Sequence, residues 1–207
     1  MQILSLLGST RVAVTAAPDP QPAAGEVVVR TAVSALCGSE LKGYRGDAGS
    51  VGNNGHEAAG TVSALGAGVT SLQVGQRVGL SAIVGCGTCE QCAAGRYTWC
   101  AARRFIGNMH AEQICIPAHG CHPLPADLSW EAGVLLSGDG MGVPFHTSTR
   151  LSDPAIRTVA IFGVGPIGLG NLLMQHFLGR QVLAVDISPT RLDLAQELGG
   201  YCEKALC

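Results

Sequence analysis

The chain has 207 residues, of which 47% are hydrophobic and 14% charged, with a net charge of −2 and nine cysteines. This composition excludes a disordered chain, and the slightly acidic balance argues against a nucleic-acid partner. No apolar run reaches the roughly 18 residues that a membrane-spanning helix needs, so we expect no membrane partner. The opening segment MQILSLLGSTR lacks a basic start and a cleavage pattern, so it predicts a first strand and not a signal peptide.

Short strand-like runs separated by glycine and proline occupy the first two thirds of the chain. The candidate strands are 27–29, 58–65, 78–84 and 113–117. Such runs, with few helical periods between them, predict a β-rich and barrel-like domain through about residue 150.

One cysteine and one histidine lie on separate loops of this β-rich part. Cys37 follows the first run and His56 precedes the second. A catalytic zinc ion takes three protein ligands of such types together with water, so a third ligand is needed. The pair alone is weak evidence for a metal site, because a single buried cysteine or histidine is common in protein cores.

Four further cysteines gather in one loop. They are Cys86, Cys89, Cys92 and Cys100. Zinc accepts a tetrahedral shell of four thiolates without an open position, so this spacing predicts a structural zinc site. An iron–sulfur cluster and ordinary buried or reactive cysteines are the competing interpretations. Clustered CxxC spacing in a large apolar chain favours metal over disulfides, and with it a cytoplasmic location.

The pattern changes after Asp153 to an alternation of strands and helices. The expected elements are a strand over 158–162, a helix over 166–178, a strand over 181–185 and a helix that begins with Ser188 and Pro189. This order predicts the start of a parallel α/β sheet, which forms a second domain over residues 151–207.

A glycine-rich turn joins the first of these strands to its helix. The turn consists of Gly163, Val164, Gly165, Pro166, Ile167 and Gly168. Its GxGxxG pattern permits a tight turn and lets a dinucleotide pyrophosphate approach the helix N-terminus. Asp186 ends the next strand, where a carboxylate binds ribose hydroxyls and favours NAD over NADP. Arg191 is a candidate neighbour on the adenine side, and an exposed helix arginine is the alternative.

Taken in order, these motifs resemble the zinc-dependent medium-chain alcohol dehydrogenases, in particular their polyol and threonine dehydrogenase branch. Residues 55–69 match the family's zinc signature GHExxGx5GxxV, and residues 37–40 resemble its Cys-Gly-Thr/Ser-Asp segment. The resemblance implies a mixed α/β protein. A β-rich GroES-like catalytic domain would occupy residues 1–150, and the first half of a Rossmann NAD-binding domain residues 151–207.

The resemblance also implies roles for single residues. Cys37, His56 and Asp139 correspond to the ligands of a catalytic zinc ion, with a helix-capping role as the alternative for Asp139. Glu57 corresponds to a carboxylate beside the metal, and Ser39 to the hydroxyl that begins the proton relay from the alcohol.

Three positions depart from the family pattern. Glu40 stands where an aspartate commonly steadies the ligand histidine, and Lys42 where many members have the histidine of the relay. His110 lies in an unusual GNMH segment, where it lines the substrate cleft or belongs to a surface loop.

The expected function is therefore oxidation of a secondary alcohol or polyol, with zinc ions and NAD as cofactors. The family has further strands and a return to its first domain, so we expect a C-terminally truncated member. A non-catalytic zinc-binding remnant is the second interpretation. A zinc-ribbon nucleic-acid binder is disfavoured by the acidic balance and the 4% aromatic content. Exposed sheet edges promote association, which leaves a homo-oligomer open.

Overall fold

The computed structural model describes residues 1–46 and 52–204. The chain divides into two compact units, Met1–Gly138 and Asp139–Cys207, and each has its own hydrophobic core. The division lies at the start of helix α4 (Asp139–Arg150), whereas the sequence pattern predicts a boundary at residue 150, the end of that helix. The domain assignment itself stays a prediction. Among the described residues, every helix is too short or too polar to cross a membrane.

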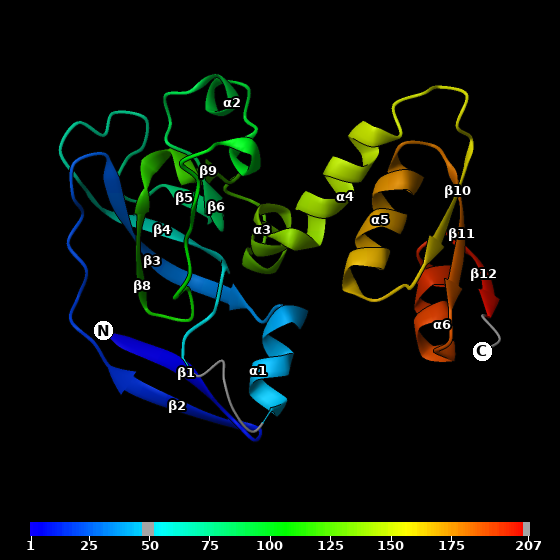
Figure 1. Ribbon diagram of the computed structural model, residues 1–207, viewed down its shortest axis with the longest axis horizontal. Helices are drawn as coiled ribbons and strands as arrows, with labels where there is room; N and C mark the ends of the chain where they lie inside the picture. Colours follow the sequence, from blue (N-terminus) through cyan, green and yellow to red (C-terminus); the bar gives the residue numbers. More distant parts are fainter. Residues whose placement is uncertain (47–51, 205–207) are drawn as a thin grey trace. The chain divides into compact units, whose positions relative to one another are not determined.

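A five-stranded antiparallel sheet forms the centre of the first unit (Figure 1). In sheet order its strands are β8 (Gln113–Pro117), β3 (Glu26–Ala35), β4 (Glu57–Leu65), β5 (Arg77–Leu80) and β9 (Cys121–Pro123). Val27, Val28 and Val29 of this central strand are all buried, and Val27 and Val29 belong to the hydrophobic core. The β-branched residues that predict this strand therefore also supply the core.

The pairing of β3 with β4 decides which loops meet. Ala35, the last residue of β3, pairs with Glu57, the first residue of β4. The segment that leaves β3 and the segment that enters β4 consequently lie side by side. Gly60 permits the close pairing, since a Cβ atom there would lie 2.2 Å from the carbonyl oxygen of Arg30.

The remaining elements of the first unit are short. They are the hairpin β1 (Gln2–Gly8) and β2 (Arg11–Ala16), the pair β6 (Ile83–Val84) and β7 (Arg104–Phe105), η1 (Gly38–Glu40), α1 (Leu41–Arg45), α2 (Glu90–Ala93), η2 (Tyr97–Trp99), η3 (Ala118–Gly120) and α3 (Trp130–Ser137). The single strand expected over 78–84 is wrong, because β5 and β6 are separate strands in different sheets. Between them Ser81 donates its N–H to the carbonyl of Gly120 at 2.9 Å.

The second unit alternates strands with helices around a parallel sheet of order β10-β11-β12. After α4 its elements are β10 (Thr158–Phe162), α5 (Pro166–Phe177), β11 (Gln181–Asp186), α6 (Pro189–Glu197) and β12 (Tyr201–Lys204). Leu172 of α5 and Val182 and Ala184 of β11 are buried in its core. The expected strand–helix order is confirmed, and Pro189 occupies the first turn of α6 as predicted.

Candidate metal and cofactor sites

The four-cysteine loop brings its thiols together. The sulfur atoms of Cys86, Cys89, Cys92 and Cys100 all lie within 4.8 Å of one another. The Sγ atom of Cys92 is 3.6 Å from that of Cys89 and 3.9 Å from that of Cys86. A tetrahedral shell with Zn–S bonds of about 2.3 Å places its sulfurs roughly 3.8 Å apart. The loop therefore fits one zinc ion with four thiolate ligands.

Local backbone geometry shapes this loop. A Cβ atom at Gly85 would lie 2.2 Å from the Cys92 sulfur, so only glycine fits there. Gly87 has φ +81° and Gly95 φ +70°, the left-handed conformation that glycine adopts at little cost. The hydroxyl of Thr88 forms a hydrogen bond with the Cys86 sulfur. This bond is the largest of several hydrogen bonds that together lower the pKa of the Cys86 thiol to about 5. Burial instead raises the pKa of Cys92 to about 11.

A second cluster forms where β3 ends and β4 begins. The ligand atoms of Cys37, His56 and Glu57 lie within 4.8 Å of one another, although Cys37 follows β3 and the other two lie at the start of β4. Nδ1 of His56 is 3.0 Å from the carbonyl oxygen of Asn54, so Nδ1–H donates to it. This tautomer directs the lone pair of Nε2 outward, the arrangement found in metal-binding histidines. One thiolate, one imidazole and a carboxylate suit zinc.

Asp139, the expected third ligand, is the first residue of the second unit and begins α4. It follows Gly138, whose backbone lies against Glu57: a Cβ atom at Gly138 would be 2.9 Å from Cγ and Oε1 of that glutamate. Ser39 and Lys42 are exposed in η1 and α1, on the turn that follows Cys37.

The sequence alone does not define the surroundings of Glu40 and His110, and the structure shows them. Glu40 is buried and binds the N–H of Cys37 and the ring of His110. His110 is also buried, so the surface-loop alternative is wrong. Asn53 is a further participant that the sequence did not single out. Its side chain binds the backbone of His110 and Gly55, a contact between distant segments that no local pattern reveals.

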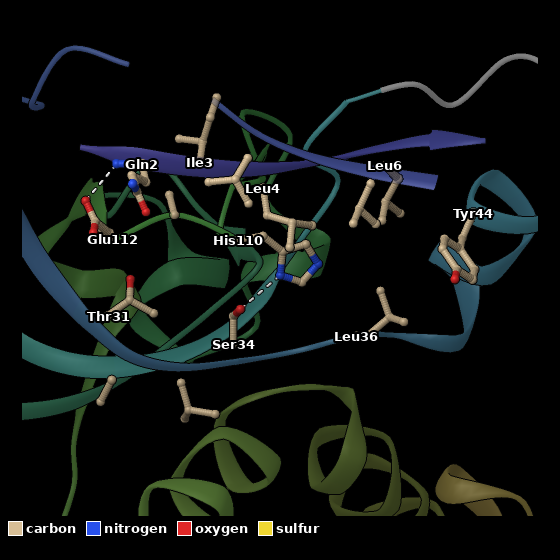
Figure 2. A pocket seen from close by; sticks show the side chains of 15 residues that line it. Gln2, Ile3, Leu4, Leu6, Thr31, Ser34, Leu36, Tyr44, His110 and Glu112 are labelled. Atoms are coloured by element: carbon tan, nitrogen blue, oxygen red, sulfur yellow. Dashed lines mark hydrogen bonds between the residues drawn. The ribbon is translucent and has the colours of Figure 1, made fainter. Parts of the chain in front are cut away.

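His110 and Ser34 supply polar groups to a mainly apolar pocket of about 670 Å³ between the β1–β2 hairpin and β3 (Figure 2). Its apolar lining includes Ile3, Leu4, Leu6, Val12, Val14 and Leu36. The hydroxyl of Ser34 and Nδ1 of His110 are 2.9 Å apart at one side of this space.

The glycine turn of the second unit is held by Asp186. One carboxylate oxygen accepts the N–H of Val164 at 2.8 Å, and the other accepts the N–H of Ser188 at 2.9 Å. Arg191 lies 3.6 Å from the same carboxylate. The backbone hydrogen bonds from Ser188 and then Val164 hold the pKa of Asp186 below its ordinary value.

The remaining motif residues occupy the expected positions in this turn. Gly163 has φ +88°, and Gly165 precedes Pro166 and Ile167 at the start of α5. A Cβ atom at Gly168 would lie 2.0 Å from the carbonyl oxygen of Gly163, so glycine is required for this close approach. The result is a tight turn at a helix N-terminus, a site suited to phosphate groups.

Comparisons with known proteins agree with this geometry. The family model for the alcohol dehydrogenase GroES-like domain matches residues 23–126. A probable D-xylulose reductase A of Aspergillus clavatus is 32% identical over 83% of the chain and 51% of its own length. An L-threonine 3-dehydrogenase of Mesorhizobium japonicum is 33% identical over 88% of the chain and 55% of its own length. The chain thus spans about half the length of these curated relatives.

A solved structure supports the same likeness. The structure of galactitol-1-phosphate dehydrogenase from Escherichia coli superimposes with a TM-score of 0.86 and 31% identity, covering 99% of this chain and 61% of that one.

Proposed function

This chain belongs to the alcohol dehydrogenase GroES-like family, and from that membership we propose that it serves the oxidation of a secondary alcohol or polyol, with zinc and NAD as cofactors. The observation that carries the proposal is the meeting of Cys37, His56 and Glu57 at the paired ends of β3 and β4. Zinc held there would supply Lewis acidity that lowers the pKa of a substrate alcohol. Relatives named as xylulose reductase and threonine dehydrogenase support a small polyol or hydroxy compound as the substrate.

Three residues are proposed as ligands of this catalytic zinc ion. Cys37 and His56 supply a thiolate and an imidazole, and Asp139 supplies the carboxylate. The support for Asp139 is its place in the chain directly after Gly138, which lies against Glu57. The four cysteines of the 86–100 loop are proposed to hold a structural zinc ion, because four thiolates leave no position for substrate.

Two residues are proposed to act on the substrate's proton and the site's charge. Ser39 is exposed two residues after Cys37, and its Oγ atom would accept the proton of the substrate hydroxyl while passing its own to solvent. Glu57 is buried beside Cys37 and His56. Its carboxylate would balance the positive charge of the metal and orient the ligand side chains.

The second unit is proposed as the beginning of a Rossmann domain that binds NAD. Its parallel strands β10, β11 and β12 with α5 and α6 between them support that reading. The turn formed by Gly163, Gly165, Pro166, Ile167 and Gly168 would hold the pyrophosphate. The Asp186 carboxylate would bind ribose hydroxyls and repel a 2′-phosphate, which favours NAD over NADP. Arg191, beside Asp186, would lie on the adenine side.

A cytoplasmic location is part of the same proposal. Its support is the gathering of four cysteines at CxxC spacing, a pattern that favours metal binding in a reducing compartment over disulfides. Self-association through the exposed strand edges stays a prediction, which size-exclusion chromatography with light scattering would check.

The proposal is tested by measuring zinc content, NAD binding and alcohol-dependent NADH formation on the full chain. We expect two zinc ions per chain, tighter binding of NAD than of NADP, and NADH formation with a polyol or secondary alcohol. Cys37→Ser should abolish turnover, whereas Cys115→Ser, outside both clusters, should retain it. Zinc uptake without NAD binding or turnover would contradict the proposal and support the second interpretation, a zinc-binding protein without dehydrogenase activity.

A further inference from the structure

His110 and Glu40 form a buried pair that the proposed chemistry does not use. Glu40 is 4% exposed and His110 is 8% exposed, and Nε2 of the histidine lies 2.8 Å from Oε1 of the glutamate. The other ring nitrogen, Nδ1, lies 2.9 Å from the hydroxyl of Ser34 (Figure 2). Both ring nitrogens therefore have partners, as burial of an imidazole requires.

The second oxygen of Glu40 connects this pair to Cys37. Oε2 accepts the backbone N–H of Cys37 at 2.9 Å, and the N–H of Glu40 donates in return to the carbonyl of Cys37 at 3.0 Å. These two bonds close the turn η1, at whose start Cys37 stands. The carboxylate thus fixes the backbone of one proposed zinc ligand, and the His110 ring fixes the carboxylate.

The backbone of His110 reaches the other ligand-bearing loop. Its carbonyl accepts from Nδ2 of Asn53 at 2.9 Å, and its N–H donates to Oδ1 of the same residue at 3.1 Å. Oδ1 also accepts the N–H of Gly55 at 3.3 Å, and the N–H of Met109 donates to the carbonyl of Gly55 at 2.9 Å. Gly55 directly precedes His56.

Close contact between the His110 ring and this loop adds a steric restraint. A Cβ atom at Gly55 would lie 2.7 Å from the ring carbons of His110. The ring therefore packs directly on the backbone beside His56. Any side chain at either position that changes this fit would move the loop.

We propose that His110 is a positioning residue for the metal site of Cys37 and His56. Its ring acts on Cys37 through Glu40, and its backbone acts on the loop of His56 through Asn53 and Gly55. One residue between β7 and β8 thereby sets the spacing of two ligands from separate loops. The inference rests on the proposed function, because it assumes that these two residues bind zinc.

The test titrates zinc into the metal-free full chain against a chromophoric chelator and compares three variants. His110→Phe keeps a ring of similar size and removes both polar contacts. His110→Gln keeps a side-chain N–H that can reach Glu40. His122→Phe is the control, because it removes another histidine–serine hydrogen bond of 2.9 Å, to Ser81, and neither residue belongs to a metal-ligand cluster.

We expect His110→Phe to weaken the second zinc equivalent roughly 10- to 100-fold, the effect typical of losing the residues that orient metal ligands. The first equivalent, in the four-cysteine loop, should bind as in the unaltered chain. His110→Gln should recover part of the loss, and His122→Phe should leave both equivalents unchanged. With cobalt in place of zinc, the absorption bands of the second equivalent should shift in His110→Phe, shift less in His110→Gln and stay unchanged in His122→Phe.

Three results would overturn the inference. Unchanged affinity for both equivalents in His110→Phe and His110→Gln would show that the ring does not position the site. An equal loss at both equivalents, with a lower melting temperature of the metal-free chain, would show a role in folding alone. Uptake of a single equivalent by the unaltered chain would refute the proposed function, and the inference with it.

Discussion

The two metal-ligand clusters of the first unit differ in how the chain assembles them. The loop of residues 86–100 carries all four of its cysteines in one short segment, and its glycines permit the folding of the loop around an ion. Cys37 and His56 instead come from loops that meet only because β3 pairs with β4 in one register. The first cluster therefore depends on local sequence, and the second depends on the sheet and on the Glu40–His110 pair.

The largest effect on zinc binding is expected from removing one thiolate of the four-cysteine cluster. This change tests whether the two clusters bind zinc independently. Cys100 is 1% exposed, and Cys100→Ser leaves three thiolates around the ion. We expect the first zinc equivalent to weaken by more than the roughly 100-fold that loss of an orienting partner costs. Zinc titration should show the second equivalent unchanged, since it uses no residue of the loop.

Cys115→Ser provides the control for this experiment, because Cys115 lies on β8 outside both clusters. Loss of both equivalents in Cys100→Ser would show that the clusters are not independent.

A smaller effect is expected from changing the strand pairing. At Gly60 a larger side chain would meet the carbonyl of Arg30, so Gly60→Val should push β4 away from β3. We expect the free energy of unfolding to fall by roughly 1–3 kcal/mol, as for other overpacked sites. The zinc ion of the second cluster should bind more weakly, by less than the roughly 100-fold expected at the first cluster in Cys100→Ser, while the four-cysteine loop keeps its affinity.

Gly142→Ala is the matched control, since nothing lies within 4 Å of a Cβ atom at that position in α4. An added methyl in an open helix position should raise stability by about 0.5–1 kcal/mol and leave zinc binding unaltered. Unchanged zinc affinity at the second cluster in Gly60→Val would contradict the dependence of that cluster on strand pairing.

The smallest expected effect is a change in the free energy of unfolding with pH. It concerns the Asp186 carboxylate at the glycine turn, which neither zinc cluster should influence. The backbone N–H groups of Ser188 and Val164 hold the pKa of Asp186 below its ordinary value of 3.8. The stabilising contribution of this carboxylate is therefore complete above about pH 4, and it is lost as the pH falls through the lower folded-state pKa.

The corresponding experiment compares urea unfolding of the chain with that of Asp186→Asn across this pH range. We expect the difference in unfolding free energy to be constant above about pH 4 and to shrink in stronger acid. Zinc titration at neutral pH should be identical for the two proteins. A difference that does not change with acid would contradict the role of the carboxylate in holding the glycine turn.

Much of the fold follows from short segments of the sequence. Strands 113–117 and 158–162 lie where the apolar pattern predicts them, and α5 begins at Pro166 directly after the glycine turn. The run 78–84 is the exception. Its apolar residues predict one strand, but they pair with two different partners: β5 pairs with β9, and β6 pairs with β7 in a separate sheet.

The sites show the same division between local and distant determinants. Spacing alone predicts the four-cysteine loop, because its ligands are close in the sequence. The position of His110 could not be predicted in this way, since its partners Glu40, Asn53 and Ser34 come from segments 57 to 76 residues away. Only the folded sheet brings these groups together.

The most direct test of two distinct zinc sites is X-ray absorption at the zinc edge on the fully loaded chain. Four sulfurs at one site and one at the other predict two zinc ions per chain and an average of about 2.5 sulfurs per zinc. One zinc ion per chain with about four sulfurs around it would contradict the second site and the dehydrogenase function proposed for it.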